Sequence, residues 1–161
     1  MPPQTLMAAT LAGLLVMGVA TVSRASDRPA PPVPTVAPQT QAETLYRQGM
    51  LQYHKGNYEA AIALYTDSLS LQPASAVTLS ARAGAWGNLA DYEAAIADYS
   101  AAIALDADLA PAYGGRGWAR SLTGELNAGV SDLWIAAQLF RAQDQLEQYF
   151  QTLAIIHNLA P

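Results

Sequence analysis

The sequence contains no cysteine, only two histidines and a single lysine among its 161 residues. The absence of cysteine excludes disulfide bonds, thiolate metal sites and a cysteine nucleophile. Two histidines, His54 and His157, are too few for a histidine-rich metal cluster. Charged residues make up 13% of the chain, well below the ordinary share, and the net charge is −5. This acidic balance argues against nucleic acid or an anionic lipid surface as the main partner.

Apolar residues make up 52% of the chain, so the sequence can bury a core and is not wholly disordered. The length corresponds to roughly one domain of ordinary size. We find no set of nucleophile, base and orienting residue at catalytic spacing. We therefore expect a protein that is not an enzyme and that uses no cofactor, metal or small-molecule substrate.

The amino-terminal region holds a long apolar run. Residues 6–22 form 17 consecutive uncharged positions, a length between a secretory core of about 7–15 residues and a membrane span of about 20. Small residues at Ser23 and Ala25 fit a signal-peptidase cut after Ala25. Two interpretations stay open: residues 1–25 are a cleaved export signal, or they remain as a membrane anchor.

Residues 26–40 are rich in proline, which occupies five of the ten positions 29–38. Proline removes backbone donors and favours an extended, polyproline-like path, so this stretch cannot build a core. We expect a semi-stiff linker before a folded domain over residues 41–161.

A 34-residue period governs that domain. The six residues at 58–63 recur without change at 92–97, and a degenerate copy stands at 126–131. Flanking columns keep the same spacing, with small residues at Gly49, Ala83 and Gly117 and leucines at Leu71, Leu105 and Leu139. Chance does not align so many columns, so the chain is a repeat array.

The apolar spacing within each period is helical. Ala95, Tyr99, Ala102 and Ile103 lie at i, i+4, i+7 and i+8 and share one helix face. Turn residues such as Gly56 interrupt the pattern twice per period, so each period is two antiparallel helices. The expected helices cover residues 41–54, 58–71, 75–88, 92–105, 109–122, 126–141 and 145–159.

These columns resemble those of the tetratricopeptide repeat family, with repeats at about 42–75, 76–109 and 110–143. The columns that carry the resemblance include Leu45, Gly49, Tyr58, Ala61, Tyr65 and Pro73 in repeat one, Leu79, Ala83, Tyr92, Ala95 and Tyr99 in repeat two, and Tyr113, Gly117, Gly129, Leu133 and Ala136 in repeat three. The resemblance implies an all-α fold: a right-handed α–α superhelix, a solenoid of three helix-turn-helix repeats with a capping helix over 145–159. The stripe expected to close the end of repeat three consists of Leu146, Tyr149, Phe150, Leu153, Ile156 and Leu159.

Two charged columns recur, Arg82 with Arg116 and Asp98 with Asp132. In repeat one both change together, to Gln48 and Leu64. This joint change predicts partly buried Arg–carboxylate pairs that hold the helices in register; contact with a ligand is the alternative.

In tetratricopeptide repeat proteins, peptides lie in a concave groove lined by the first helix of each repeat. The resemblance places these positions at Tyr46, Met50, Tyr53 and His54, at Ser80, Gly84, Gly87 and Asn88, and at Gly114, Trp118, Ser121 and Leu122. Tyr46 and Met50 stand where chaperone-binding relatives have the Lys and Asn that hold a terminal carboxylate, so we do not expect that clamp. The groove would instead have aromatic residues at both ends and a floor of Gly and Ser. Such a groove would admit an extended or helical apolar segment. The alternative is that Tyr46 and Trp118 only pack against neighbouring residues.

Glycines within these helices cost up to about 1 kcal/mol each relative to alanine. Gly84, Gly87, Gly114 and Gly115 therefore indicate close backbone contact, either between helices or with a ligand.

We expect a non-enzymatic protein–protein interaction module that binds a partner protein or peptide, as an assembly or scaffold factor. From Ser26 onward the chain has 7 Lys and Arg against 13 Asp and Glu, which favours neutral or basic partners. The chain is similar to small bacterial, especially cyanobacterial, members of the family, and this resemblance implies a role in the assembly of envelope or thylakoid complexes. From the apolar run at residues 6–22 we expect export to a periplasm, a thylakoid lumen or the medium. Two alternatives stay open: a self-associating structural protein, and an assembly cofactor tethered to a membrane through the run between Leu6 and Val22.

Overall fold

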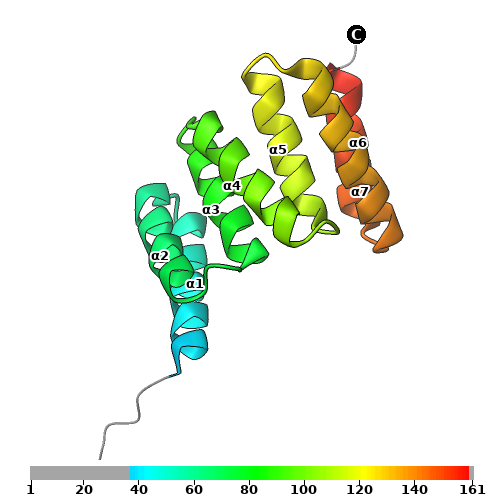
Figure 1. The fold of residues 1–161 in the computed structure, drawn as a ribbon. Coiled ribbons are helices and arrows are strands. Elements are labelled where there is room, and N and C mark those ends of the chain that lie inside the picture. The colour runs from blue at the N-terminus through cyan, green and yellow to red at the C-terminus, as the bar shows by residue number, and fades with distance from the viewer. Residues whose placement is uncertain (1–36, 160–161) are drawn as a thin grey trace, which may run out of the picture. The chain divides into compact units, whose positions relative to one another are not determined.

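The computed structural model describes residues 37–159, which form seven α-helices and no β-strand within that range (Figure 1). The helices are α1 (Pro38–His54), α2 (Tyr58–Leu71), α3 (Ala76–Asn88), α4 (Tyr92–Leu105), α5 (Ala110–Leu122), α6 (Leu126–Ala142) and α7 (Leu146–Leu159). The predicted all-α fold is confirmed. None of the helices in this range is long and apolar enough to cross a membrane. The signal or anchor expected at residues 1–25 and most of the linker lie outside the described residues.

Local signals in the sequence set the helix boundaries. Helix α1 begins at Pro38, inside the linker expected at 26–40. Proline suits the first helical position because its φ angle is already helical and no N–H is needed there. Ser75 and Asp91 cap α3 and α4 by accepting hydrogen bonds from backbone N–H groups of the first turn.

Each repeat reverses direction through the same turn. Gly56, Ala90 and Gly124 follow the first helices of the repeats and have positive φ angles of 80°, 61° and 92°. The N–H of the next residue then bonds a carbonyl five residues earlier, as from Asn57 to Gln52. This pattern is the Schellman end of a helix, and it returns at the period that the sequence predicts.

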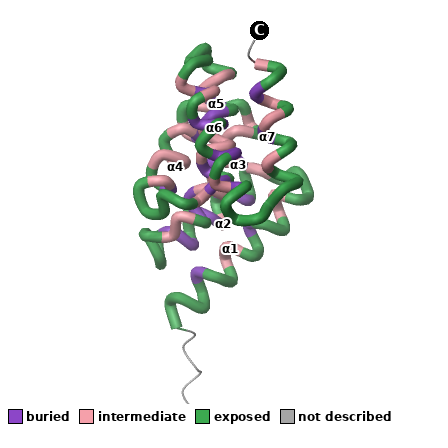
Figure 2. The backbone as a smooth tube through the Cα atoms, turned by 90° about the vertical axis from the view of Figure 1, so that its right-hand side faces the viewer, coloured by how far each residue is buried: buried purple, intermediate pink, exposed green. Residues whose placement is uncertain are grey.

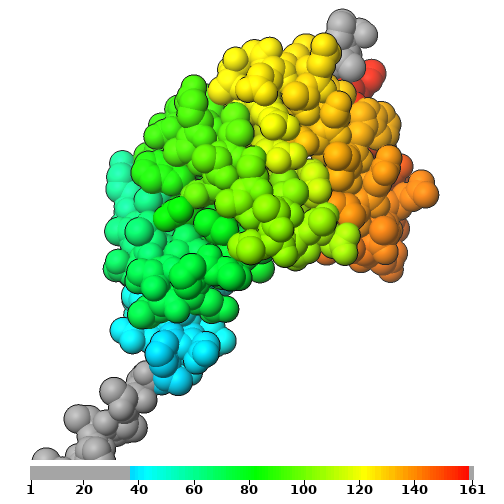
Figure 3. All heavy atoms as spheres, in the orientation of Figure 1, coloured from blue at the N-terminus to red at the C-terminus, as the bar shows by residue number. Residues whose placement is uncertain are grey.

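Every helix packs against the next one along the chain, and α3 also contacts both α1 and α5. The first helices of the repeats therefore lie next to one another along one side of the array. Buried residues gather between the helices (Figure 2). In the space-filling view, the coloured bands follow one another in chain order, so each repeat covers part of its successor (Figure 3).

Tyrosines and small residues fill the core between repeats. Tyr65 of α2 is 1% exposed and packs against Ala85 of α3. A Cβ atom at Gly49 would lie 2.6 Å from the Tyr65 ring, so glycine is what allows α1 to approach α2 this closely. At Gly117 a Cβ atom would lie 2.7 Å from the carbonyl oxygen of Gly129 in α6. The structure therefore has the close approach expected at this column.

The last helix covers the end of the array with only part of its apolar stripe. Ile156 of α7 is buried, and Tyr149 packs against Phe140 of α6. Leu146 and Phe150, however, are 49% and 63% exposed. These two residues of the stripe expected to close the end of repeat three are not covered, because α6 is the main neighbour of α7 among the described helices.

Candidate functional site

A groove runs along the first helices of the repeats and contains two adjoining cavities. The larger has a volume of about 360 Å³ and is lined by residues of α1, α3 and the start of α5, with tyrosines from α2 and α4. Six of the positions placed in the groove from the sequence line it: Tyr46, Met50, Tyr53, His54, Ser80 and Gly84. Its size lies within the range of about 300–1,000 Å³ that is common for ligand sites.

The smaller cavity, of about 180 Å³, continues the larger one toward α5. The two cavities share Tyr53, Gly84 and Tyr99, so they are two parts of one groove. Gly87, Asn88 and Trp118, which the resemblance places in the groove, line the smaller part. Trp118 remains 46% exposed, so it does not serve only to fill the core. Tyr46 both fills the core and lines the groove. Its ring packs on Tyr65, with ring centroids 5.8 Å apart, and it also lines the larger cavity.

Three positions expected in the groove, Gly114, Ser121 and Leu122, line neither cavity. A Cβ atom at Gly114 would lie 3.7 Å from Ala136 of α6, so Gly114 belongs to the packing of α5 on α6. The Ser121 hydroxyl donates to the carbonyl of Gly117, 2.8 Å away, within its own helix. Leu122 is exposed beyond the smaller cavity.

Several residues that line the groove were not predicted from the sequence to do so. Tyr65 and Tyr99 reach it from the second helices, and the sequence indicated them only as packing residues. Val77 and Pro111, in the first turns of α3 and α5, also line the larger cavity. Val77 and Pro111 occupy the same position of successive repeats, 34 residues apart, but they differ in residue type and repeat one has Glu43 there, so no recurring residue marks this position.

Hydrogen bonds fix the polar centre of the groove. The side-chain N–H groups of Asn88 donate to the Tyr53 hydroxyl at 2.9 Å and to the Gly84 carbonyl at 2.8 Å. Tyr58 holds the Tyr53 ring by an edge-to-face contact, with centroids 5.4 Å apart. A Cβ atom at Gly84 would lie 3.5 Å from the Tyr99 hydroxyl and 3.7 Å from that of Tyr53. The groove floor at Gly84 is therefore bordered by two hydroxyl groups.

Burial favours the neutral form of three tyrosines of the groove. Burial raises the pKa of Tyr65 and of Tyr99 to about 12, and it also raises the pKa of Tyr46. No Lys, Arg, Asp or Glu among the described residues lines either cavity. The groove consequently offers a bound molecule apolar surface, hydroxyls, the Asn88 amide and the His54 imidazole, and no Lys, Arg, Asp or Glu side chain of the described residues.

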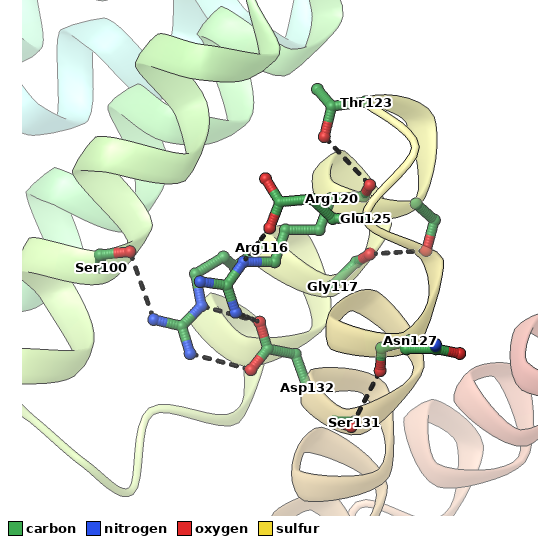
Figure 4. Close-up of polar contacts among 10 residues, drawn as sticks. Ser100, Arg116, Gly117, Arg120, Thr123, Glu125, Asn127, Ser131 and Asp132 are labelled. Atoms are coloured by element: carbon green, nitrogen blue, oxygen red, sulfur yellow. Dashed lines mark hydrogen bonds and ion pairs between the residues drawn. The ribbon is translucent and has the colours of Figure 1, made fainter.

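The charged columns lie outside the groove and join the two helices of repeat two and the two helices of repeat three. Arg82 donates to both carboxylate oxygens of Asp98, at 2.7 and 2.8 Å. Arg116 donates in the same way to Asp132, at 2.8 Å for both bonds (Figure 4). Hydrogen bonding to Asp98 raises the pKa of Arg82. The geometry is that of a bidentate Arg–carboxylate pair, which fixes the relative rotation of two helices.

Each of these arginines also reaches back to the preceding repeat. Arg82 donates to the Thr66 hydroxyl at 3.1 Å, and Arg116 donates to the Ser100 hydroxyl at 3.2 Å. This second contact was not predicted from the sequence, although Thr66 and Ser100 stand 34 residues apart.

Repeat three adds a second arginine to its pair. Arg120 donates at 2.8 Å to Oδ2 of Asp132, the oxygen that also accepts from Nε of Arg116. The Nε atom of Arg120 lies 3.7 Å from a carboxylate oxygen of Glu125 (Figure 4). Recurrence could not reveal this residue, because the matching positions are Gln52 and Trp86.

Comparison with known proteins identifies the repeat. Family models described as tetratricopeptide repeat match residues 42–75 and 85–109. Hsc70-interacting proteins 1 and 2 of Drosophila melanogaster are each 33% identical over 99 residues, which cover 62% of this chain. The chain spans only 26% of the length of these curated relatives.

Solved structures share the fold. The second tetratricopeptide domain of Spaghetti (RPAP3), bound to the HSP90 peptide SRMEEVD, is 33% identical, with 63% of this chain and 94% of that one covered and a TM-score of 0.61. The second such domain of human RPAP3, bound to the HSP70 peptide SGPTIEEVD, is 31% identical, with coverage of 74% and 98% and a TM-score of 0.66. The Yersinia enterocolitica chaperone SycD, at 19% identity, coverage of 74% and 91% and a TM-score of 0.70, shares the fold alone.

Proposed function

This chain belongs to the tetratricopeptide repeat family, and we propose that its groove binds a segment of a partner protein. One observation carries the proposal: the two adjoining cavities form a continuous groove along α1, α3 and α5, with exposed aromatic surface at Trp118. Related domains of RPAP3 bind peptides of partner proteins, which supports the same use of the fold here.

The proposal gives the groove no catalytic role. In the described part of the chain, the polar side chains lining it are tyrosines, Ser80, Asn88 and His54. These groups are not arranged as a nucleophile, a base and a group that orients the base. Binding without chemistry is the function that such a surface supports.

Alanine substitutions in the groove test the proposal. We expect Trp118→Ala and Tyr46→Ala each to weaken capture of the partner by the immobilised protein, because both substitutions remove aromatic surface from the groove. Trp134→Ala is the matched control, since Trp134 is equally exposed but lines neither cavity. Circular dichroism verifies that each variant is folded. Equal capture by all three folded variants would contradict binding in the groove.

We also propose that the protein is exported and acts as an assembly or scaffold factor. The apolar run at residues 6–22 and the small residues Ser23 and Ala25 support export, and the absence of cysteine agrees with it. The alternative is that the run persists as a membrane tether. Mass spectrometry of the mature protein distinguishes the two, because cleavage makes Ser26 the first residue, whereas a tether retains residues 6–22.

Self-association is a second candidate function, and the exposed Leu146 and Phe150 favour it. Light scattering over a range of concentrations tests it directly. A mass that stays monomeric at all concentrations would exclude this candidate.

A further inference from the structure

Tyr53 and Asn88 lie at the polar centre of the groove and are hydrogen-bonded to each other. The hydroxyl hydrogen of Tyr53 and the side-chain oxygen of Asn88 remain available to a ligand. We propose that this pair binds an uncharged amide of the partner segment, so that the groove selects neutral peptide segments and rejects acidic ones. This inference rests on the proposed function and specifies the chemistry of its ligand.

The hydrogen-bond inventory of the pair leads to this assignment. Asn88 has two side-chain N–H donors, and both are used, one by the Gly84 carbonyl and one by the Tyr53 hydroxyl. A carbonyl can only accept, so the Asn88 nitrogen must face Gly84 and the orientation of the amide is fixed. The Asn88 oxygen and the Tyr53 hydroxyl hydrogen have no partner among residues 37–159.

An amide complements these two free groups. A peptide group offers one N–H for the Asn88 oxygen and one carbonyl for the Tyr53 hydroxyl. A carboxylate offers acceptors only, so one of its oxygens would lie against the lone pairs of Asn88. Turning the Asn88 amide to present its N–H groups would break its bonds to the Gly84 carbonyl and the Tyr53 hydroxyl.

The distribution of charge disfavours an acidic ligand as well. A carboxylate is bound most strongly by a cationic side chain, and no Lys or Arg lines the described groove. The arginines of α3 and α5 are held by Asp98 and Asp132. Residues 37–159 contain six Lys and Arg against twelve Asp and Glu, so the surrounding field also repels anions.

The larger cavity specifies a second element of the ligand. Tyr46, Met50, Val77 and Pro111 give it apolar walls. An apolar side chain next to the bound amide would fill this space, as in other grooves that combine main-chain hydrogen bonds with a side-chain pocket. The predicted ligand is a neutral segment with an apolar residue beside a main-chain amide or an Asn or Gln side chain.

The test begins with selection of binding peptides. A random dodecapeptide library on phage is selected on the immobilised full chain, and enriched peptides are synthesised for anisotropy measurements. We expect the enriched sequences to be depleted in Asp and Glu and to bind at least tenfold more tightly than the acidic peptide SRMEEVD. Tyr53→Phe should weaken their binding about fivefold, as expected for one hydrogen bond. Tyr149→Phe is the matched control and should leave binding unchanged, because Tyr149 of α7 lines neither cavity.

The outcomes separate this inference from the proposed function. Enriched acidic peptides that Trp118→Ala no longer binds would overturn the selectivity and leave groove binding intact. Equal affinity of wild type and Tyr53→Phe for neutral peptides would overturn the role of the amide-binding pair. Failure to enrich any peptide that depends on Trp118 would overturn the proposed function itself.

Discussion

At the scale of single residues, the turn at Ala90 carries strain that its two counterparts avoid. Gly56 and Gly124 occupy the same position, and glycine adopts positive φ without cost, whereas an L-residue pays about 1–2 kcal/mol. No atom lies within 4 Å of a Cβ atom built at either glycine, so the backbone conformation alone decides the outcome.

We expect Ala90→Gly to raise the free energy of unfolding by about 0.5–1 kcal/mol, since relief of strain exceeds the added chain entropy. Gly56→Ala should lower it by about 1 kcal/mol. Urea titration followed by circular dichroism measures both. A loss of stability in Ala90→Gly would show that this turn carries no such strain.

Two glycines of the groove helices should respond to alanine in opposite directions. A Cβ atom at Gly87 meets nothing within 4 Å, whereas one at Gly115 would collide with the Tyr99 ring. We expect Gly87→Ala to raise stability by about 0.5–1 kcal/mol through helix propensity. Gly115→Ala should lower it by about 1–3 kcal/mol through overpacking. Thermal unfolding compares them, and a stabilising Gly115→Ala would contradict the contact with Tyr99.

At the scale of helix pairs, the two Arg–Asp columns are not equivalent. Asp132 accepts three hydrogen bonds from Arg116 and Arg120, and its side chain is 5% exposed. Asp98 accepts two, from Arg82 alone, and its side chain is 14% exposed. Removing one partner of a buried ion pair costs about 3–5 kcal/mol, because an uncompensated charge stays behind.

We therefore expect Asp132→Ala to lower the free energy of unfolding by about 3–5 kcal/mol, and Asp98→Ala to lower it by less. Arg82→Ala should lower the melting temperature without abolishing binding of the partner, since Arg82 does not line the groove. Denaturant unfolding ranks the variants. A folded Arg82→Ala protein that no longer binds would show that the pair contacts the ligand.

The helices were predictable from the sequence to the extent that their signals recur. The hexapeptide at 58–63 and 92–97 and the small-residue column gave the period, and the structure places the helix pairs accordingly. Arg120 could not be found this way, because a contact made in one repeat leaves no column. The exposure of Phe150 was also unpredictable, since an apolar stripe does not say which of its sides has a neighbour. The groove positions came from the resemblance, and the two that face α6 or their own helix, Gly114 and Ser121, depend on backbone distances that a sequence does not contain.

At the scale of the whole array, contacts between neighbouring repeats supply the cohesion. Tyr65 joins α2 to α3, and Tyr99 packs against Gly115 of α5. The bonds from Arg82 and Arg116 to the preceding repeat run across the same two interfaces. In such an array each repeat is stabilised by its neighbours, so a change at one interface affects the stability of the whole.

The same tyrosines predict how stability depends on pH. Burial raises the pKa of Tyr65 and Tyr99 from 10.0 to about 12 in the folded protein, whereas in the unfolded chain the phenols ionise near their ordinary pKa of about 10. Below pH 10 the phenols are neutral in both states and their contribution is fully present. Between about pH 10 and 12 the unfolded state loses protons first, so the free energy of unfolding falls, by as much as about 3 kcal/mol for each tyrosine.

We expect Tyr99→Phe to make this fall shallower, because phenylalanine has no proton to lose. Urea titrations of wild type and variant at pH 8, 10, 11 and 12 measure the effect. The comparison at pH 8, where both phenols are protonated, serves as the control, since it isolates any change in packing caused by the loss of the hydroxyl. If the two stability curves run parallel from pH 8 to 12, the Tyr99 phenol ionises equally easily in the folded and unfolded states. The interface between repeats two and three would then be open to water, which contradicts the packing of Tyr99 against Gly115.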